Sequence, residues 1–235
     1  MKEFLETDWC GKWATYSPDK FFLREHSTGK EWNYYDFNCR ANALANWFIY
    51  DLKLEKGDRI AVYSKNRAEF ILLFVACVKA GMILVPLNFR LTPRELDTLI
   101  YDAEPSVFIH ESVFSGEVKA LTTLEPIPHK IEMESINTFL TAEFADTKLQ
   151  FKNVADFEDP VMILYTAGTT GLSKGVIITN KQLFWNAVNT VLRLNLTHTD
   201  HTQSYAPFFH TGGWNVLLTP FLFVGGSHTL LNSFE

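Results

Sequence analysis

The spacing of apolar residues first predicts a short N-terminal region made of a helix, a hairpin and a second helix. Apolar residues at helical spacing over 3–15 predict a short amphipathic helix. Two apolar runs at 21–24 and 31–34, separated by the turn at 27–30, predict a β-hairpin. Apolar positions between 37 and 52 then predict a longer helix, and Gly57 ends this region.

From residue 58 onward, patterns typical of strands and helices alternate, which predicts an α/β fold with a mostly parallel sheet and helices on both faces. Between 111 and 159 the pattern weakens and predicts only short elements around Val118, Ile131 and Phe139. The expected strands are 59–63, 82–85 (ended by Pro86), 106–109, 161–165, 176–179, 204–206 and 228–231. The expected helices are 68–80 (ended by Gly81), one that begins at Thr92-Pro93, 182–193 and 213–223. Thr92 and Glu95 are expected to form a capping box at the start of the second helix.

Composition indicates an ordinary globular protein. The 235 residues are 47% hydrophobic and 20% charged, with room for one large domain or two small ones. The net charge of -6 argues against nucleic acid or an anionic membrane as a main partner. The longest apolar stretch, 70–87, contains Lys79 and Gly81, so we expect no membrane span, and no signal-like run precedes it.

The three cysteines, Cys10, Cys39 and Cys77, are far apart and odd in number, so we expect no disulfide framework and no zinc site. They are typical of reduced thiols in a cytoplasmic protein. His198 and His201 are close in sequence, but no cluster of cysteines or carboxylates accompanies them, and we expect no metal there.

A loop between two apolar strands carries the chemistry. Its glycines let the backbone N–H groups approach an anion, and its hydroxyls and one lysine add further donors. The spacing differs from the phosphate loop of nucleotide hydrolases, because a β-branched run and not a helix follows the lysine. The loop is therefore predicted to hold phosphate without a helix dipole, through Thr166, Gly168, Thr169, Thr170, Gly171, Ser173, Lys174 and Gly175.

This loop resembles the core signature of the adenylate-forming enzymes, a family of acyl-CoA synthetases, peptide-synthetase adenylation domains and luciferases. Ala167 stands where serine is usual, and Ser173 stands where proline is usual. Both residues are small, so the loop should survive. Further stretches similar to the family are 56–61, 66–70, 80–91 and 206–213 with 225–226, in the family's order.

The resemblance implies where the ligands bind. The ATP phosphates would be held by Thr166, Ala167, Gly168, Thr169, Thr170, Gly171, Ser173 and Lys174. His210 would lie beside the α-phosphate and the substrate carboxylate, as the catalytic residue. Apolar side chains around it, Phe208, Phe209 and Trp214 with Leu217 and Leu218, would wall a pocket for a hydrophobic acid. Taken from the residues alone, Asn88 and Arg90 have a structural interpretation, as caps of nearby backbone groups.

The resemblance also implies the fold and its division. The chain is expected to be the first half of the large N-terminal domain of an adenylate-forming enzyme. Residues 1–55 and 202–235 would belong to one incomplete lobe, and residues 56–201 would form the α/β lobe that carries the phosphate loop. Apolar surface left exposed at Phe208, Phe221 and Phe223 would favour homo-oligomers.

The implied activity is that of an ATP-dependent carboxylate–CoA ligase, which forms an acyl-adenylate and then an acyl-CoA, using ATP, Mg²⁺ and coenzyme A. The family's motifs for adenine, ribose and magnesium, and its lid lysine, have no counterpart in these 235 residues. We therefore expect a fragment that does not turn over ATP alone. Alternatives are a non-catalytic phosphate- or nucleotide-binding fragment, a fragment of a peptide-synthetase-type adenylation domain, and a purely structural piece.

Overall fold

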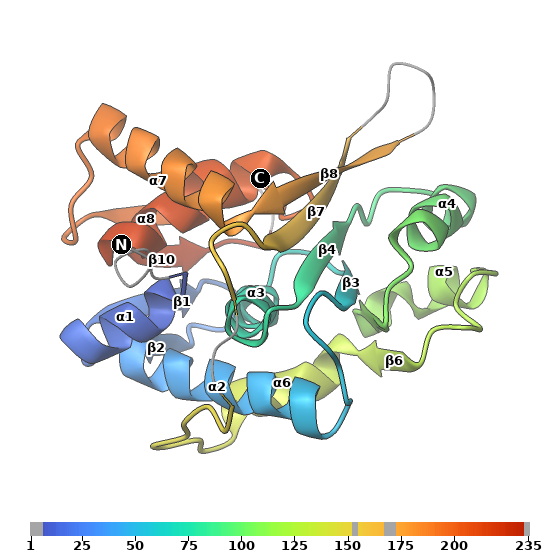
Figure 1. Ribbon diagram of the computed structural model, residues 1–235, viewed down its shortest axis with the longest axis horizontal. Helices are drawn as coiled ribbons and strands as arrows, with labels where there is room; N and C mark the ends of the chain where they lie inside the picture. Colours follow the sequence, from blue (N-terminus) through green and yellow to red (C-terminus); the bar gives the residue numbers. More distant parts are fainter. Residues whose placement is uncertain (1–6, 152–154, 167–172, 233–235) are drawn as a thin grey trace.

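The computed structural model describes residues 7–151, 155–166 and 173–232 and contains a larger, six-stranded sheet with the order β6-β5-β3-β4-β7-β8. All neighbours in it are parallel except β7 and β8. These antiparallel strands form a hairpin at one edge of the sheet (Figure 1). The strands are β3 (Arg59–Tyr63), β4 (Ile83–Leu87), β5 (Val107–His110), β6 (His129–Glu132), β7 (Pro160–Thr166) and β8 (Lys174–Thr179).

Helices cover both faces of the larger sheet, as the sequence pattern predicts. Alternate residues of β3 enter different hydrophobic clusters: Ile60 and Val62 face one, and Ala61 and Tyr63 face the other. The first cluster contains α3 (Ala68–Ala80), every residue of which is buried, with α2 (Tyr34–Tyr50) and α6 (Met133–Thr141) around it (Figure 1). The second contains α4 (Pro93–Ala103), which lies near the 3₁₀ turn Ser112–Phe114 and α5 (Ser115–Lys119).

A smaller, four-stranded sheet joins the two ends of the chain. Its order is β2-β1-β10-β9, so the early hairpin pairs with the last strand, with Leu23 opposite His228. Helices α1, α7 and α8 lie beside it (Figure 1). The division into lobes at residues 55 and 201 stays a prediction. The bounds are β1 (Phe21–Glu25), β2 (Glu31–Asn33), β9 (His201–Ser204), β10 (Ser227–Leu230), α1 (Trp9–Tyr16), α7 (Asn180–Leu194) and α8 (Thr219–Val224).

Local signals at helix ends are confirmed. Thr92 caps α4, and the Thr92 N–H donates to Glu95 Oε2 at 2.8 Å, which completes the capping box. Gly81 follows α3 with φ 71°, a left-handed conformation that favours glycine. The segment after α6 is held to α2 by buried asparagines, and the weak region 111–159 contains the short elements expected there.

Some expected boundaries are wrong. Pro86 does not end its strand but lies inside β4, opposite Val62. On its other side, β4 pairs with β7 through Leu84 and Met162. Proline has no backbone N–H, and Pro86 lies beyond this pair, so the pairing of β4 with β7 does not need the N–H that it lacks. The strand expected at 204–206 ends at Ser204.

The helix expected at 213–223 is divided in two by its backbone hydrogen bonding. It begins as a π-helix, Gly213–Leu218, in which the Thr219 N–H donates to Trp214 O, and continues as α8. Pro220 lies at the first turn of α8 and has no N–H to give to the preceding turn, which accounts for the break.

The expected exposed phenylalanines are not exposed. Phe208 is 1% exposed and Phe221 is 8% exposed. Phe223 is partly buried, with its ring 5.2 Å from that of Trp9 and 5.5 Å from that of Phe184. The prediction of an apolar surface at these residues is therefore wrong, and homo-oligomer formation stays a prediction without them. None of the helices in the described ranges is long and apolar enough to cross a membrane.

Candidate functional site

The β7–β8 hairpin holds both ends of the predicted phosphate loop. Thr166 lies opposite Lys174, and Tyr165 lies opposite Gly175, so the threonine hydroxyl and the lysine ammonium start from neighbouring backbone positions at the loop end of the hairpin. A strand follows Lys174, which confirms that no helix dipole supports the loop from that side. The predicted ligands Ala167, Gly168, Thr169, Thr170 and Gly171 lie outside the described residues.

Close packing in the hairpin requires glycine at position 175. A Cβ atom there would lie 2.9 Å from Ile163 Cγ2 and 3.4 Å from the Tyr165 ring. Contacts below 3.0 Å force one of the two neighbours to move. Gly175 therefore lets β8 approach β7 closely beside Lys174, so the sequence signature has a packing role as well as its predicted binding role.

A cavity of about 240 Å³ brings the loop ends together with the predicted histidine. Thr166 and Ser173 line one part of it, and His210 lines another. Lys174 is exposed next to Ser173 and is not among the lining residues. The other residues that line this pocket are Pro86, Asn88, Leu91, Leu99, Tyr165 and Phe209.

His210 lies in a tight turn that follows β9. The backbone N–H of His210 donates to Pro207 O at 3.0 Å, and its backbone carbonyl accepts from the Gly213 N–H at 3.1 Å. A Cβ atom on Gly213 would lie 2.8 Å from Pro207 O, so glycine allows the turn to close. The side chain of His210 is exposed beside the buried ring of Phe209, with 4.6 Å between the ring centroids. The turn thus presents the imidazole to the pocket.

The apolar wall of the pocket differs from the expectation. Phe209 contributes to it, but Phe208 and Trp214 are packed in the core, with their rings stacked 4.5 Å apart. Leu218 is also fully buried. Phe208 packs in the core and Phe209 lines the pocket, so the two rings do not share a wall. The remaining apolar surface comes from Pro86, Leu91 and Leu99, which the sequence did not single out.

Tyr165 is a pocket residue that the sequence analysis missed. Its hydroxyl donates to Asp102 Oδ2 at 2.6 Å and lies 3.3 Å from Leu99 O, which ties the loop end of the hairpin to α4. Burial, and then the hydrogen bond to Asp102, raise the pKa of Tyr165. The phenol is therefore protonated at neutral pH and positions the pocket wall as a donor. Its place directly before Thr166 at a strand end is the only signal in the sequence.

The polar groups near the pocket fit a phosphate better than a metal ion. Hydroxyls from Thr166 and Ser173 line it and Lys174 is adjacent, whereas none of the described lining residues is acidic. Asn88 Oδ1 accepts from the Arg90 N–H at 3.0 Å, which confirms its structural interpretation. The Arg90 guanidinium lies 5.8 Å from the ring centroid of Phe209, so it packs on the wall behind His210.

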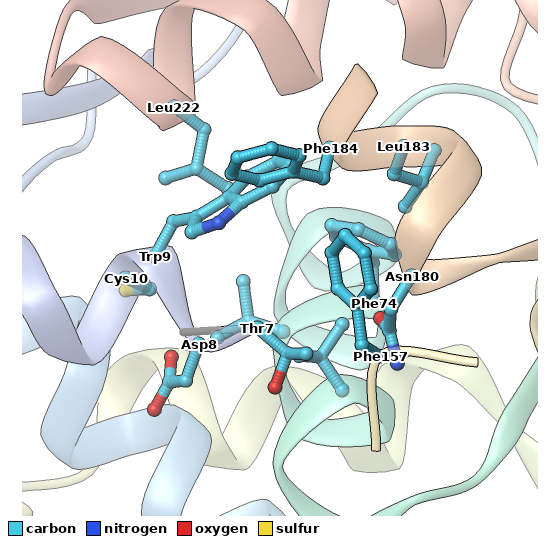
Figure 2. Close-up of a pocket in the computed structure, with 12 residues that line it drawn as sticks. Thr7, Asp8, Trp9, Cys10, Phe74, Phe157, Asn180, Leu183, Phe184 and Leu222 are labelled. Carbon is cyan, nitrogen blue, oxygen red and sulfur yellow. The ribbon is translucent and has the colours of Figure 1, made fainter. Parts of the chain in front are cut away.

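A second cavity is too small to be the site. Its volume is about 20 Å³, which is room for about one water molecule. Figure 2 shows Trp9, Phe184 and Leu222 closing it from α1, α7 and α8, with Phe74 of α3 below. It contains no residue of the loop or of the turn at His210, so it belongs to the packing between helices.

Comparisons with known proteins agree on one family. A family model described as "AMP-binding enzyme" matches residues 10–235. Feruloyl-CoA synthase of an Amycolatopsis species is 30% identical over 229 residues, which cover 97% of this chain and 44% of that protein. The chain thus spans less than half the length of this relative.

Solved structures give the same result. ATP-bound MatB from Rhodopseudomonas palustris superposes with a TM-score of 0.81 at 26% identity, covering 97% of this chain and 46% of that one. The inhibitor-bound N-terminal domain of FACL13 from Mycobacterium tuberculosis gives a TM-score of 0.83 at 25% identity, covering 97% and 57%. The expected fold, that of the N-terminal domain of adenylate-forming enzymes, is confirmed.

Proposed function

Because the chain belongs to the AMP-binding enzyme family, we propose that it acts within an ATP-dependent carboxylate–CoA ligase that takes a hydrophobic acid. The observation that carries this proposal is the pocket in which Thr166 and Ser173 meet His210. A carboxylate activated by ATP must lie between a phosphate site and an acid site. This pocket has the hydroxyls of Thr166 and Ser173 in one part, and the imidazole of His210 beside the ring of Phe209 in another.

In the proposed reaction, a carboxylate oxygen of the acid attacks the α-phosphorus of ATP, and the bond to the pyrophosphate oxygen breaks. Lys174 and the loop hydroxyls stabilise the negative charge that develops on pyrophosphate. The imidazole of His210 has a ring N–H that would donate a hydrogen bond to the reacting carboxylate and so orient it. Coenzyme A would supply the thiol that later takes the acyl group, and Mg²⁺ would offset phosphate charge. We assign no described residue to either.

The hydrophobic acid is proposed from the pocket wall. Pro86, Leu91, Leu99 and Phe209 are apolar, and none of the described lining residues is a cation that would pair with a second acidic group on the substrate. A related protein of this family is a feruloyl-CoA synthase. A medium-chain or aryl acid is therefore the proposed substrate class.

Binding of ATP and pyrophosphate to the 235-residue chain, measured by isothermal titration calorimetry, tests the phosphate site. Lys174→Ala should weaken pyrophosphate binding about 10- to 100-fold, the effect of one lost charge-assisted hydrogen bond. Lys181→Ala is the matched control, because Lys181 is an exposed lysine that is paired with Glu158 and lies beyond the other end of β8. Absence of binding by the unaltered chain, or an equal loss in both variants, would contradict the proposal.

A second measurement separates a nucleotide-binding module from a ligase part. We expect no carboxylate-dependent pyrophosphate release from the 235-residue chain by itself, because the family residues for adenine, ribose and the lid have no counterpart in it. ATP binding that no carboxylic acid or acyl-adenylate analogue affects would favour a non-catalytic nucleotide-binding role. Binding of an acyl-adenylate analogue more tightly than ATP would support the ligase.

A further inference from the structure

The side chain of Asn66 joins two segments that are far apart in the sequence. Asn66 lies in the loop between β3 and α3 and is only 3% exposed. Its Nδ2 donates to Ala206 O at 2.9 Å, and its Oδ1 accepts from the Phe208 N–H at 3.0 Å. One side chain thus satisfies a carbonyl and an N–H two residues apart, as a neighbouring strand would.

These two hydrogen bonds fix the chain just before the pocket turn. Phe208 is held on its other side by packing against Phe70 and Trp214, with ring centroids 5.3 Å and 4.5 Å away. The Trp214 indole N–H also donates to Phe208 O. With the backbone at 206–208 fixed and the Phe208 ring held in the core, Phe209 and His210 are left to face the pocket.

The loop that carries Asn66 is itself firmly anchored. The Lys65 N–H donates to Glu111 Oε2 at 3.1 Å, and the Arg67 guanidinium forms a salt bridge with Glu69 at 2.8 Å. The Ala68 N–H donates to Glu25 Oε1 at 3.1 Å, which connects the start of α3 to the smaller sheet. Asn66 therefore connects the pocket turn to a loop that is itself held in place at the end of the larger sheet.

We propose that Asn66 is a positioning residue that sets the place of Phe209 and His210 in the acid-binding part of the pocket. Asn66 is not among the residues that line the pocket, so it acts through the backbone of Ala206 and Phe208. This inference deepens the proposed function and rests on it for one point, that the pocket binds the acid. The position of His210 can be tested without any ligand.

The chain offers a matched control in Asn46. Asn46 of α2 is 8% exposed, its Nδ2 donates to Lys148 O at 2.9 Å, and its Oδ1 accepts from the Gln150 N–H at 2.9 Å. It thus makes the same pair of bonds to an extended segment, far from the pocket. Asn66→Ala and Asn46→Ala each remove one side chain that bonds a backbone carbonyl and a backbone N–H, so both should lower the melting temperature.

The first measurement is the NMR spectrum of the histidine ring protons and carbons in the 235-residue chain, with His210 assigned through His210→Gln. Asn66→Ala should shift or broaden the His210 signal, and Asn46→Ala should leave it unchanged. Asn66→Asp keeps the acceptor for the Phe208 N–H and should give a smaller change. If Asn66→Ala does not fold, Asn66→Asp provides the test instead. An unchanged His210 signal in the Asn66 variants, or the same change in Asn46→Ala, would overturn the inference.

The second measurement is calorimetric binding of 5′-O-(N-octanoylsulfamoyl)adenosine, an acyl-adenylate analogue, and of ATP. Asn66→Ala should weaken binding of the analogue about tenfold and alter ATP binding less than about twofold, because preorganisation is lost only at the acid end. Equal weakening of both would overturn the inference. If the unaltered chain binds neither compound, the proposed function fails, and the His210 signal still decides the positioning role.

Discussion

Acidification should destabilise the smaller sheet through His228. His228 of β10 is fully buried, between the rings of Phe22 and Phe221 at 5.5 Å and 6.0 Å. Burial, which is the largest cause, and the nearby His201 together lower the pKa of His228 from 6.5 to about 3, although an interaction with the Leu217 backbone acts in the opposite direction. The folded chain therefore keeps His228 neutral in a pH range where the unfolded chain protonates it.

The size of the effect follows from this difference. Above pH 6.5 neither state binds the proton, so the full stability is present. As the pH falls from 6.5 toward 3, only the unfolded state gains the proton, and stability is lost. At pH 5 the loss from this one group is about 2 kcal/mol, because the unfolded pKa lies about 1.5 units above that pH.

The measurement is the free energy of unfolding by urea between pH 5 and pH 7.5, for the unaltered chain and for His228→Asn. Asparagine keeps an acceptor near the Ser204 hydroxyl, which lies 3.4 Å from His228 Nδ1. The variant should be less stable at neutral pH but should lose about one kcal/mol less per pH unit between pH 6 and pH 5. Burial also lowers the pKa of His110 and of His201, so some slope should remain. An identical slope in both proteins would refute the reasoning.

Three further predictions concern the hairpin, a buried ion pair and the pocket. Gly175→Ala should destabilise the chain by about 1–3 kcal/mol in urea unfolding, because its methyl group would overlap the β7 side chain beneath it; a neutral effect would show that the strands separate freely. Asp8→Ala should cost about 3–5 kcal/mol, because it leaves the buried ammonium of Lys79 without its carboxylate; a loss below about 1 kcal/mol would show that the ammonium reaches solvent. In a protein that contains this chain and catalyses carboxylate-dependent ATP–pyrophosphate exchange, His210→Ala should lower the exchange rate about 10- to 100-fold, or ~1.4–2.7 kcal/mol, with ATP affinity kept. An equal loss of ATP affinity in Lys174→Ala and His210→Ala would show that the histidine is misassigned.

Most helices and strands could be predicted from the sequence, because each depends on neighbours along the chain. Thr92, Pro93 and Glu95 meet within one turn of helix, so the capping box of α4 could be predicted from three letters. Gly81 after α3 and the glycine-rich loop between two β-branched runs are equally local. The family resemblance of the loop is also carried by consecutive residues, and the family match confirms it.

The pocket could not be predicted in the same way, because its walls come from segments as far apart in the sequence as Pro86 and His210. Pro86 of β4 and Tyr165 of β7 meet because neighbouring parallel strands bring their carboxyl ends to one edge of the larger sheet, whereas Phe209 comes from the turn after β9 of the smaller sheet. Phe208 and Phe209 are identical in type, and only the packing of one ring against Trp214 decides which of them enters the core.

The same distinction separates Asn66 from the signature residues. Its two hydrogen bonds span about 140 positions along the chain, and its place in the stretch 66–70 does not show which backbone groups its side chain binds. The sequence by itself therefore determined most of the helices and strands, and it locates the loop that is predicted to hold phosphate, because these features depend on residues close together in the chain. The tertiary structure alone decided which side chains share the pocket and what holds them, since those contacts exist only after distant segments have packed together.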